Sequence, residues 1–143
     1  MAYIYDPKKL IINAGGKLIV GLDGDTPVKI EFEVPERYTA SSDQYGSTTL
    51  HKTGNNNVIV TLVLSQASSG NTILSMFSAL DRESDAGAFP LFIKDDNGDS
   101  LVTATKAKII TLPTLEFGAQ HKTREWKILA LNAGFFAGGI KTT

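Results

Sequence analysis

The residues best suited to chemistry are few in this chain and lie far apart in the sequence. The two histidines, His51 and His121, are both surrounded by polar, loop-like sequence, and we interpret them as surface side chains. Glu31 and Glu33 are two residues apart in an alternating stretch, so they share one face of a predicted strand. No third polar residue completes an acid–base set, and we interpret the pair as part of a solvated face.

The densest acidic cluster, at residues 95–99, does not fit a calcium-binding loop. An EF-hand loop has glycine at its sixth position and glutamate at its twelfth. Counting from Asp95 places Gly98 fourth and Lys106 twelfth. The pair Asn97-Gly98 is typical of a tight hairpin turn, which accounts for the cluster without a metal ion.

Other catalytic and ligand-binding signatures are also absent from the sequence. Residues 15–17, Gly-Gly-Lys, lack the spacing and the following Ser or Thr of a phosphate-binding loop. The chain contains no cysteine, which excludes disulfides, thiol catalysis and thiolate metal sites. We therefore predict that the protein is not an enzyme, and that it has no catalytic, metal or cofactor-binding residues and needs no cofactor.

Length and composition indicate one globular domain spanning residues 1–143. The 14 lysines and arginines nearly balance the 15 aspartates and glutamates, whereas a dedicated nucleic-acid-binding protein normally presents a strongly basic face. The longest apolar runs, at 58–64 and 128–131, are far too short to span a bilayer. The first residues do not resemble a signal peptide, so we expect no membrane insertion.

A long strand is predicted from Asn57 to Ser65, because β-branched residues are frequent there and suit a pleated sheet. Alternate residues on one face are all apolar: Val58, Val60, Leu62 and Leu64. The opposite face is mixed, so one side of the strand must be covered by other elements.

Turn-forming residues after this strand lead into a predicted helix over 71–82, with Ser69 or Asn71 as its N-cap. Apolar residues recur at helical spacing and form one stripe: Ile73, Leu74, Phe77 and Leu80. A lone helix of this length is marginal in water. We therefore expect the stripe to pack on the apolar face of the preceding strand.

The remaining β-rich stretches bring the total to about seven strands; the others are 9–13, 17–22, 28–34, 89–93, 101–112 and 124–133. The strands are mostly sequential, with one helix inserted between them. This pattern predicts a mainly β fold, an antiparallel β-barrel or sandwich with one flanking α-helix.

Three segments do not fit the packed domain: an N-terminal arm at 1–8, a polar excursion at 36–55 and a glycine-rich C-terminal tail at 134–143. The excursion is either a long loop, which is usually functional or disordered, or a long hairpin that projects from the sheet. Exposed aromatic and apolar side chains on such segments favour contacts with other copies of the chain. We predict that these contact residues are Tyr3, Tyr5, Tyr38, Tyr45, Leu50, Phe135 and Phe136.

Four features together indicate a known family: residues 5–9 (Tyr-Asp-Pro-Lys-Lys), the excursion from Arg37 to Asn55, the helix from Asn71 to Arg82 with its Asp-Arg ending, and the closing stretch from Trp126 to Gly134. In their size, order and local sequence they resemble the tail tube proteins of contractile-tailed bacteriophages. The resemblance spans nearly the whole chain and rests on no single motif. That family is similar in fold to the tube protein of type VI secretion systems.

The resemblance implies a structural subunit that forms hexameric rings, which stack into a hollow tube inside a contractile sheath. Its implied partners are other copies of itself, the tail sheath protein, and the baseplate and tail terminator proteins, and DNA passes through the lumen without sequence-specific binding. The implied location is the virion tail, assembled in the host cytoplasm. The best-placed acids for the lumen are Glu31 and Glu33, although Lys106 and Lys108 could face the same space.

Three alternatives remain open at the level of sequence. A type VI-like secretion tube, or another tail ring such as a terminator, has much the same sequence character. A monomeric β-barrel that binds a small apolar ligand between its strand faces belongs to a different class.

Overall fold

The computed structural model describes residues 10–22, 27–84, 86–95, 100–120 and 122–138. The predicted arm at 1–8, with Tyr3 and Tyr5, lies outside the described residues, as do His121 and the turn at 96–99. Within them the chain forms ten strands and one helix. Their bounds are β1 (Leu10–Ala14), β2 (Lys17–Leu18), β3 (Val28–Phe32), β4 (Tyr38–Ser42), β5 (Thr48–Lys52), β6 (Val58–Ser65), α1 (Gly70–Ser84), β7 (Phe89–Asp95), β8 (Leu101–Thr111), β9 (Thr123–Leu131) and β10 (Gly134–Phe136).

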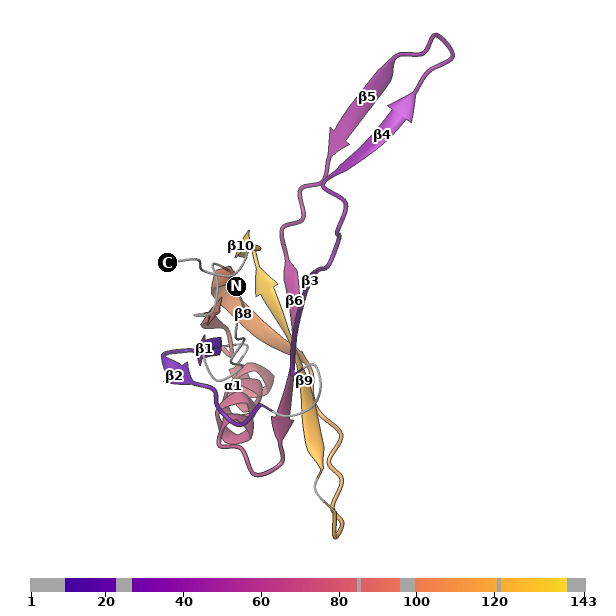
Figure 1. Ribbon diagram of the computed structural model, residues 1–143. Helices are drawn as coiled ribbons and strands as arrows, with labels where there is room; N and C mark the ends of the chain where they lie inside the picture. Colours follow the sequence, from indigo (N-terminus) through magenta and orange to yellow (C-terminus); the bar gives the residue numbers. More distant parts are fainter. Residues whose placement is uncertain (1–9, 23–26, 85, 96–99, 121, 139–143) are drawn as a thin grey trace, which may run out of the picture.

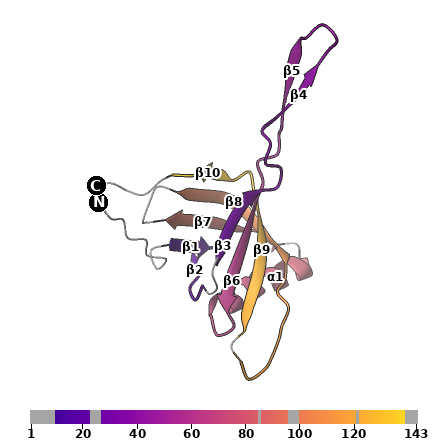
Figure 2. The same cartoon turned by 45° about the vertical axis from the view of Figure 1, so that its right-hand side comes forward.

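Eight strands form one antiparallel sheet in the order β2-β1-β7-β8-β9-β6-β3, with β10 added beside β8. The long strand β8 joins two parts of this sheet, because its first half pairs with β7 and β10 and its second half pairs with β9. Figure 2 shows β1, β7 and β10 running across the direction of β3, β6 and β9. The two parts therefore face each other over the core as in a sandwich, and the predicted mainly β fold with one flanking helix is confirmed.

The predicted strand–helix unit is present, with β6 and α1 close to the expected bounds. Alternate residues of β6 are fully buried, as predicted, whereas those on the other face are half-buried. Leu74 is the fully buried residue of the helix stripe, and the ring of Phe77 stacks on that of Phe89 with 4.4 Å between centroids. Leu80 is 47% exposed, so its assignment to the packed stripe is wrong. It lies in line with Ile73 at the edge of the stripe, seven residues further along the helix.

The excursion at 36–55 contains a β-hairpin, the second of the two possibilities considered for it. Strands β4 and β5 pair only with each other among the described residues, and all ten of their residues are exposed. Figure 1 shows the hairpin projecting from the sandwich. Its turn is closed by the carboxylate of Asp43, which accepts hydrogen bonds from the backbone amides of Tyr45 and Ser47, each at 2.9 Å.

The C-terminal segment differs from the expected tail that no strand fixes on the domain. Residues Gly134–Phe136 form β10, which pairs with the first half of β8. Beyond it, the hydroxyl of Ser100 lies 3.2 Å from both the amide nitrogen and the carbonyl oxygen of Gly138. The first half of β8 has an edge that β9 leaves open, and β10 satisfies its backbone hydrogen bonds.

Candidate assembly surfaces

The residues considered for chemistry do not converge in the structure. His51 lies on β5, where its Nε2 is 3.2 Å from the hydroxyl of Ser41 on the neighbouring strand. No group of three or more His, Asp or Glu side chains that could hold a metal ion occurs among the described residues. Within the same residues, no helix has the length and apolar character needed to cross a membrane.

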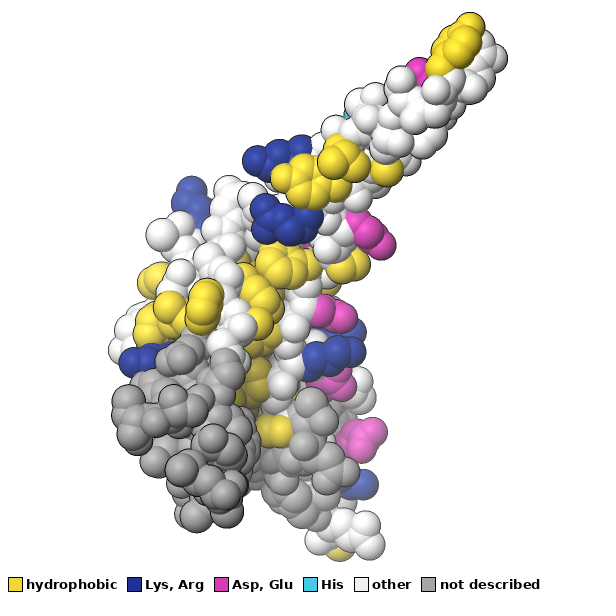
Figure 3. Space-filling model, turned by 45° about the horizontal axis from the view of Figure 1, so that its top comes forward, with side chains coloured by type: hydrophobic (Ala, Val, Ile, Leu, Met, Phe, Trp, Pro, Cys, Tyr) yellow, Lys and Arg dark blue, Asp and Glu magenta, His cyan; other side chains and the backbone are white. Residues whose placement is uncertain are grey.

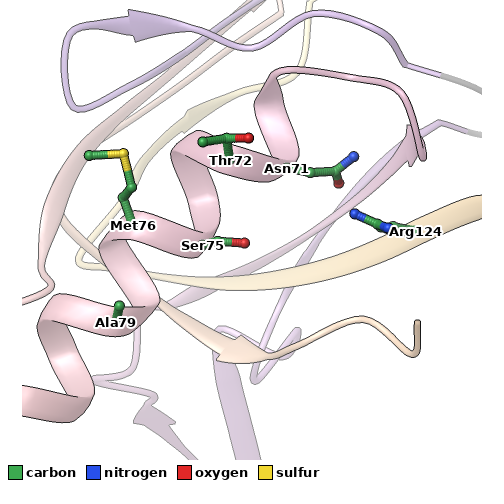
Figure 4. A pocket seen from close by; sticks show the side chains of 6 residues that line it. All are labelled: Asn71, Thr72, Ser75, Met76, Ala79 and Arg124. Carbon is green, nitrogen blue, oxygen red and sulfur yellow. The ribbon is translucent and has the colours of Figure 1, made fainter.

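Two shallow depressions occur on the surface of the described residues. The first, of about 320 Å³, is lined by Asn71, Thr72, Ser75, Met76, Ala79 and Arg124. Figure 4 shows Asn71 of α1 and Arg124 of β9 facing each other across one end of it. The second lies over β7 and β8 near Phe92 and Asn132. Both are open to solvent, whereas a small-molecule site encloses most of its ligand. The space between the sheet parts is filled by core side chains such as Trp126 and Phe89.

A buried polar network fixes the start of α1 on the sheet. The indole nitrogen of Trp126 donates to Oδ1 of Asn71 at 2.9 Å, and Nδ2 of Asn71 donates to the carbonyl of Ser65 at 2.9 Å and that of Ser68 at 3.2 Å. Asn71 is 4% exposed, and it lies inside the helix rather than capping it. Ser69, the other predicted N-cap, directly precedes the helix, and its carbonyl accepts the first helical hydrogen bonds from the amides of Thr72 and Ile73. The hydroxyl of Ser68 accepts a further hydrogen bond from the amide of Gly70.

The β4–β5 hairpin has two chemically different faces. Cross-strand pairing places Tyr38 opposite Lys52 and Ala40 opposite Leu50 on one face. The other face contains the polar pair Ser41 and His51 together with Thr39 and Thr49. Figure 3 shows hydrophobic side chains together with Lys and Arg side chains at the root of the hairpin, and hydrophobic side chains at its far tip.

The apolar hairpin residues are open to solvent in the single chain. Tyr38 is 52% exposed, Leu50 is 64% exposed and Tyr45 is 85% exposed. An isolated two-stranded hairpin is only marginally stable in water. We define the hairpin face as Tyr38, Leu50 and Lys52.

The outer face of β3, β6, β9 and the second half of β8 has charges of both signs. Register places Glu31 in one row with Ile59, Leu129 and Lys108, and Lys29 in the next row with Thr61 and Lys127. Glu33 follows β3 and is also exposed. Figure 3 shows acidic and basic side chains close together along one flank below the hairpin. Lysines thus share this face with the two glutamates, and it is not predominantly acidic.

One of the lysines on this face has a close partner on the helix. The ammonium group of Lys108 lies 3.1 Å from Oδ1 of Asp81 in α1. Glu31 lies 3.9 Å from Lys29 in a pair whose side chains are mostly exposed, so this pair adds little to stability. Two lysines of this face, Lys29 and Lys108, therefore each lie close to a carboxylate.

The two phenylalanines of β10 point in different directions, as adjacent strand residues do. The ring of Phe135 packs on that of Phe32 at a centroid distance of 4.9 Å and an interplanar angle of 56°. Phe136 is 61% exposed. Phe135 is thus held on the domain by Phe32, and Phe136 presents the free apolar surface of this strand.

Sequence reasoning missed one exposed apolar segment, in the connection between β8 and β9. Leu115 is 58% exposed and Phe117 is 80% exposed. They flank the exposed residue Glu116. Two large apolar residues in a segment bounded by Pro113 and Gly118, outside any predicted strand, are the signal that points to a contact surface.

The chain is 32% identical over 125 residues to structural protein ORF10 of Pseudomonas phage KPP10, an alignment that covers 85% of this chain and 70% of that protein. No protein-family model matches the chain.

Solved structures of contractile injection systems have a similar fold. The sheath/tube terminator of the extracellular contractile injection system PVC, in its extended state, superposes with a TM-score of 0.64 at 14% identity, over 95% of this chain and 99% of that chain. The tube-terminating cap of the anti-feeding prophage (AFP) has a TM-score of 0.62 at 12% identity, over 95% and 93%. A chain of the PVC sheath–tube complex has a TM-score of 0.61 at 16% identity, over 94% and 93%. The predicted resemblance is thereby confirmed to this extent: the chain has a relative among phage structural proteins and shares the fold of components of contractile injection systems.

Proposed function

The chain belongs to the family of phage structural proteins that includes structural protein ORF10 of Pseudomonas phage KPP10, and from this premise we propose that it is a ring-forming subunit of the tube of a contractile tail. The observation that carries the proposal is the projecting hairpin, on a domain similar in fold to a sheath/tube terminator and to a chain of a sheath–tube complex. The protein is a component of the virion that acts by assembly and not by catalysis.

The hairpin supports self-assembly because it exposes apolar surface that its own domain does not cover. All its strand residues are exposed, and one face contains Tyr38, Ala40 and Leu50. A free hairpin of two strands is marginal in water, and docking on a neighbouring copy removes this apolar area from solvent. The aromatic residues Tyr3, Tyr5 and Tyr45, together with Phe136, supply further contacts between copies, whereas Phe135 packs mainly within its own subunit.

Six copies form each ring in this proposal, and the rings stack into a hollow tube. The outer face of β3, β6 and β9, with Glu31 and Glu33 at its edge, lines the lumen. Each contact between a lysine and a DNA phosphate adds binding free energy through counterion release. The glutamates beside Lys29 and Lys127 reduce that attraction, so that DNA passes without being held.

The partners follow from this position in the tail. The sheath protein surrounds the tube, and baseplate and terminator proteins bind its two ends. The subunits assemble in the host cytoplasm before they become part of the virion.

Sedimentation of the purified protein at rising concentration tests the proposal. We expect the sedimentation coefficient to rise steeply with protein concentration for the full chain. A variant in which residues 38–52 are replaced by a short Gly-Ser turn should remain a folded monomer. A full-length chain that remains a strict monomer at every salt and protein concentration would overturn the proposal.

A terminator ring is the second candidate, because two of the three solved structures described above are a terminator and a terminating cap. A terminator forms one closed ring, whereas a tube protein adds ring upon ring. The size of the largest assembly in solution distinguishes the two candidates. A terminator should stop at a single ring, whereas a tube protein should form assemblies that grow in length.

A further inference from the structure

We propose that the hairpin face docks on the β8–β9 connection of a second copy of the chain, at Leu115, Glu116 and Phe117. This inference rests on the proposed function, because it names the surface that receives the hairpin during assembly. Both surfaces are uncovered in the single chain: Leu50 is 64% exposed and Phe117 is 80% exposed.

The two surfaces lie at opposite ends of the molecule. Figures 1 and 2 show the hairpin projecting at the top and the β8–β9 connection extending beyond the sandwich at the bottom. One surface at each end produces a head-to-tail contact, in which each copy uses its hairpin on one neighbour and its connection on the other. A head-to-tail contact can be repeated without limit, which a tube requires and a two-fold dimer does not provide.

The chemistry of the two surfaces is complementary. Tyr38 and Leu50 on the hairpin match Leu115 and Phe117 on the connection as apolar partners. Lys52, opposite Tyr38 on the same hairpin face, offers an ammonium group to Glu116, which stands between the two apolar residues of the connection. Complementary charge selects the partner and its orientation more than it adds affinity. The pairing therefore fixes which end of the next copy the hairpin meets.

The absence of cysteine from the chain allows a direct test by cross-linking. Two single variants, Leu50→Cys and Phe117→Cys, are prepared separately, mixed under assembly conditions and oxidised. A disulfide forms only where the two Cβ atoms come within about 4 Å. We expect a disulfide-linked dimer that contains one copy of each variant, located by peptide mapping.

Thr49→Cys provides the matched control, because Thr49 is exposed and lies on the opposite face of the same hairpin. Mixed with Phe117→Cys, it should give roughly tenfold less cross-linked dimer, since its Cβ points away from the proposed partner. Equal yields from the two mixtures, or a Leu50 disulfide at another partner site, would overturn the inference.

A charge exchange provides a second readout that needs no oxidation. Lys52→Glu and Glu116→Lys should each weaken sedimentation of the assembled protein, and the double variant should restore it. If wild-type protein forms tubes but the exchange gives no rescue and the cysteines do not react, the docking site is wrong and the proposed function stands. If wild-type protein forms no assembly at all, both proposals fail.

Discussion

The indole nitrogen of Trp126 and Oδ1 of Asn71 lie 2.9 Å apart and form a buried hydrogen bond between β9 and the first turn of α1. The same amide group donates to the carbonyl of Ser65 at the end of β6. One side chain thus ties the only helix of the described residues to two adjacent strands of the sheet. Buried polar groups are costly when unpaired, so this network sets the position of the helix on the sandwich.

Asn71→Ala should lower the free energy of unfolding by about 1–3 kcal/mol, because it leaves the buried indole N–H of Trp126 without an acceptor. Urea unfolding measures the loss. Trp126→Phe and the double variant complete a mutant cycle, which should show that the two single losses are not additive. Additive losses would mean that the two side chains act independently and that the hydrogen bond does not position the helix.

Gly15→Ala should destabilise the domain more than Gly16→Ala does. Both glycines have a positive φ, 62° and 86°, so each alanine has a similar backbone strain of about 1 kcal/mol. A Cβ at Gly15 would clash with Cζ of Phe77, whereas one at Gly16 would meet nothing within 4 Å. Thermal melts of both variants measure the difference. Equal melting temperatures would contradict the close approach of this turn to Phe77.

The two phenylalanines of β10 should separate stability from assembly. Phe135→Ala should cost the single subunit about 0.5–1.5 kcal/mol, because its ring packs on Phe32. Phe136→Ala should leave the melting temperature of the subunit nearly unchanged and weaken sedimentation of the assembled protein. Phe77→Ala is the reference for a packed ring, with an expected loss of roughly 3 kcal/mol. If Phe136→Ala destabilised the subunit as much as Phe77→Ala, Phe136 would belong to the core.

Backbone amides of the β4–β5 hairpin should exchange rapidly with solvent deuterium in the free subunit. They should exchange at least about tenfold more slowly after assembly. Docking on a neighbouring copy prevents the local opening of the hairpin through which its amides reach solvent. Amides of β6, which is paired on both sides, provide the internal control and should be protected in both states. Strong hairpin protection in the free subunit would show that the hairpin belongs to the subunit's own fold.

The strand–helix unit could be predicted from sequence because apolar residues recur at regular spacing in both of its elements. Alternation in β6 assigned the buried face correctly, and the helical spacing of Leu74 and Phe77 placed the packed side of α1. Leu80 was assigned wrongly, because the apolar pattern cannot tell where the sheet beneath a helix ends. The turn at Asn97-Gly98 lies outside the described residues, and its assignment stays a prediction.

The assembly surfaces were less accessible to sequence reasoning, because they depend on pairing between distant segments. Strand β10 has three residues and pairs with β8 about thirty positions earlier. Phe135 and Phe136 favour a strand, but a segment this short between glycines shows no alternating pattern. Asn71 is polar and close to a helix start, which favours a capping role, and its bond to Trp126 spans 55 positions. Leu115 and Phe117 belong to no alternating or helical apolar pattern, so the sequence does not indicate whether they are buried. Their exposure follows only from the positions of β8 and β9.

Negative-stain microscopy of the purified full-length protein at high concentration shows whether the chain assembles into a tube. We expect rings of uniform diameter with a central hole, and stacks of such rings that lengthen with protein concentration. Replacement of residues 38–52 by a short turn should abolish the stacks while the domain remains folded. Fields that contain only single globular particles, under every salt condition and at every concentration, would contradict the assignment of this chain to a self-assembling tail tube.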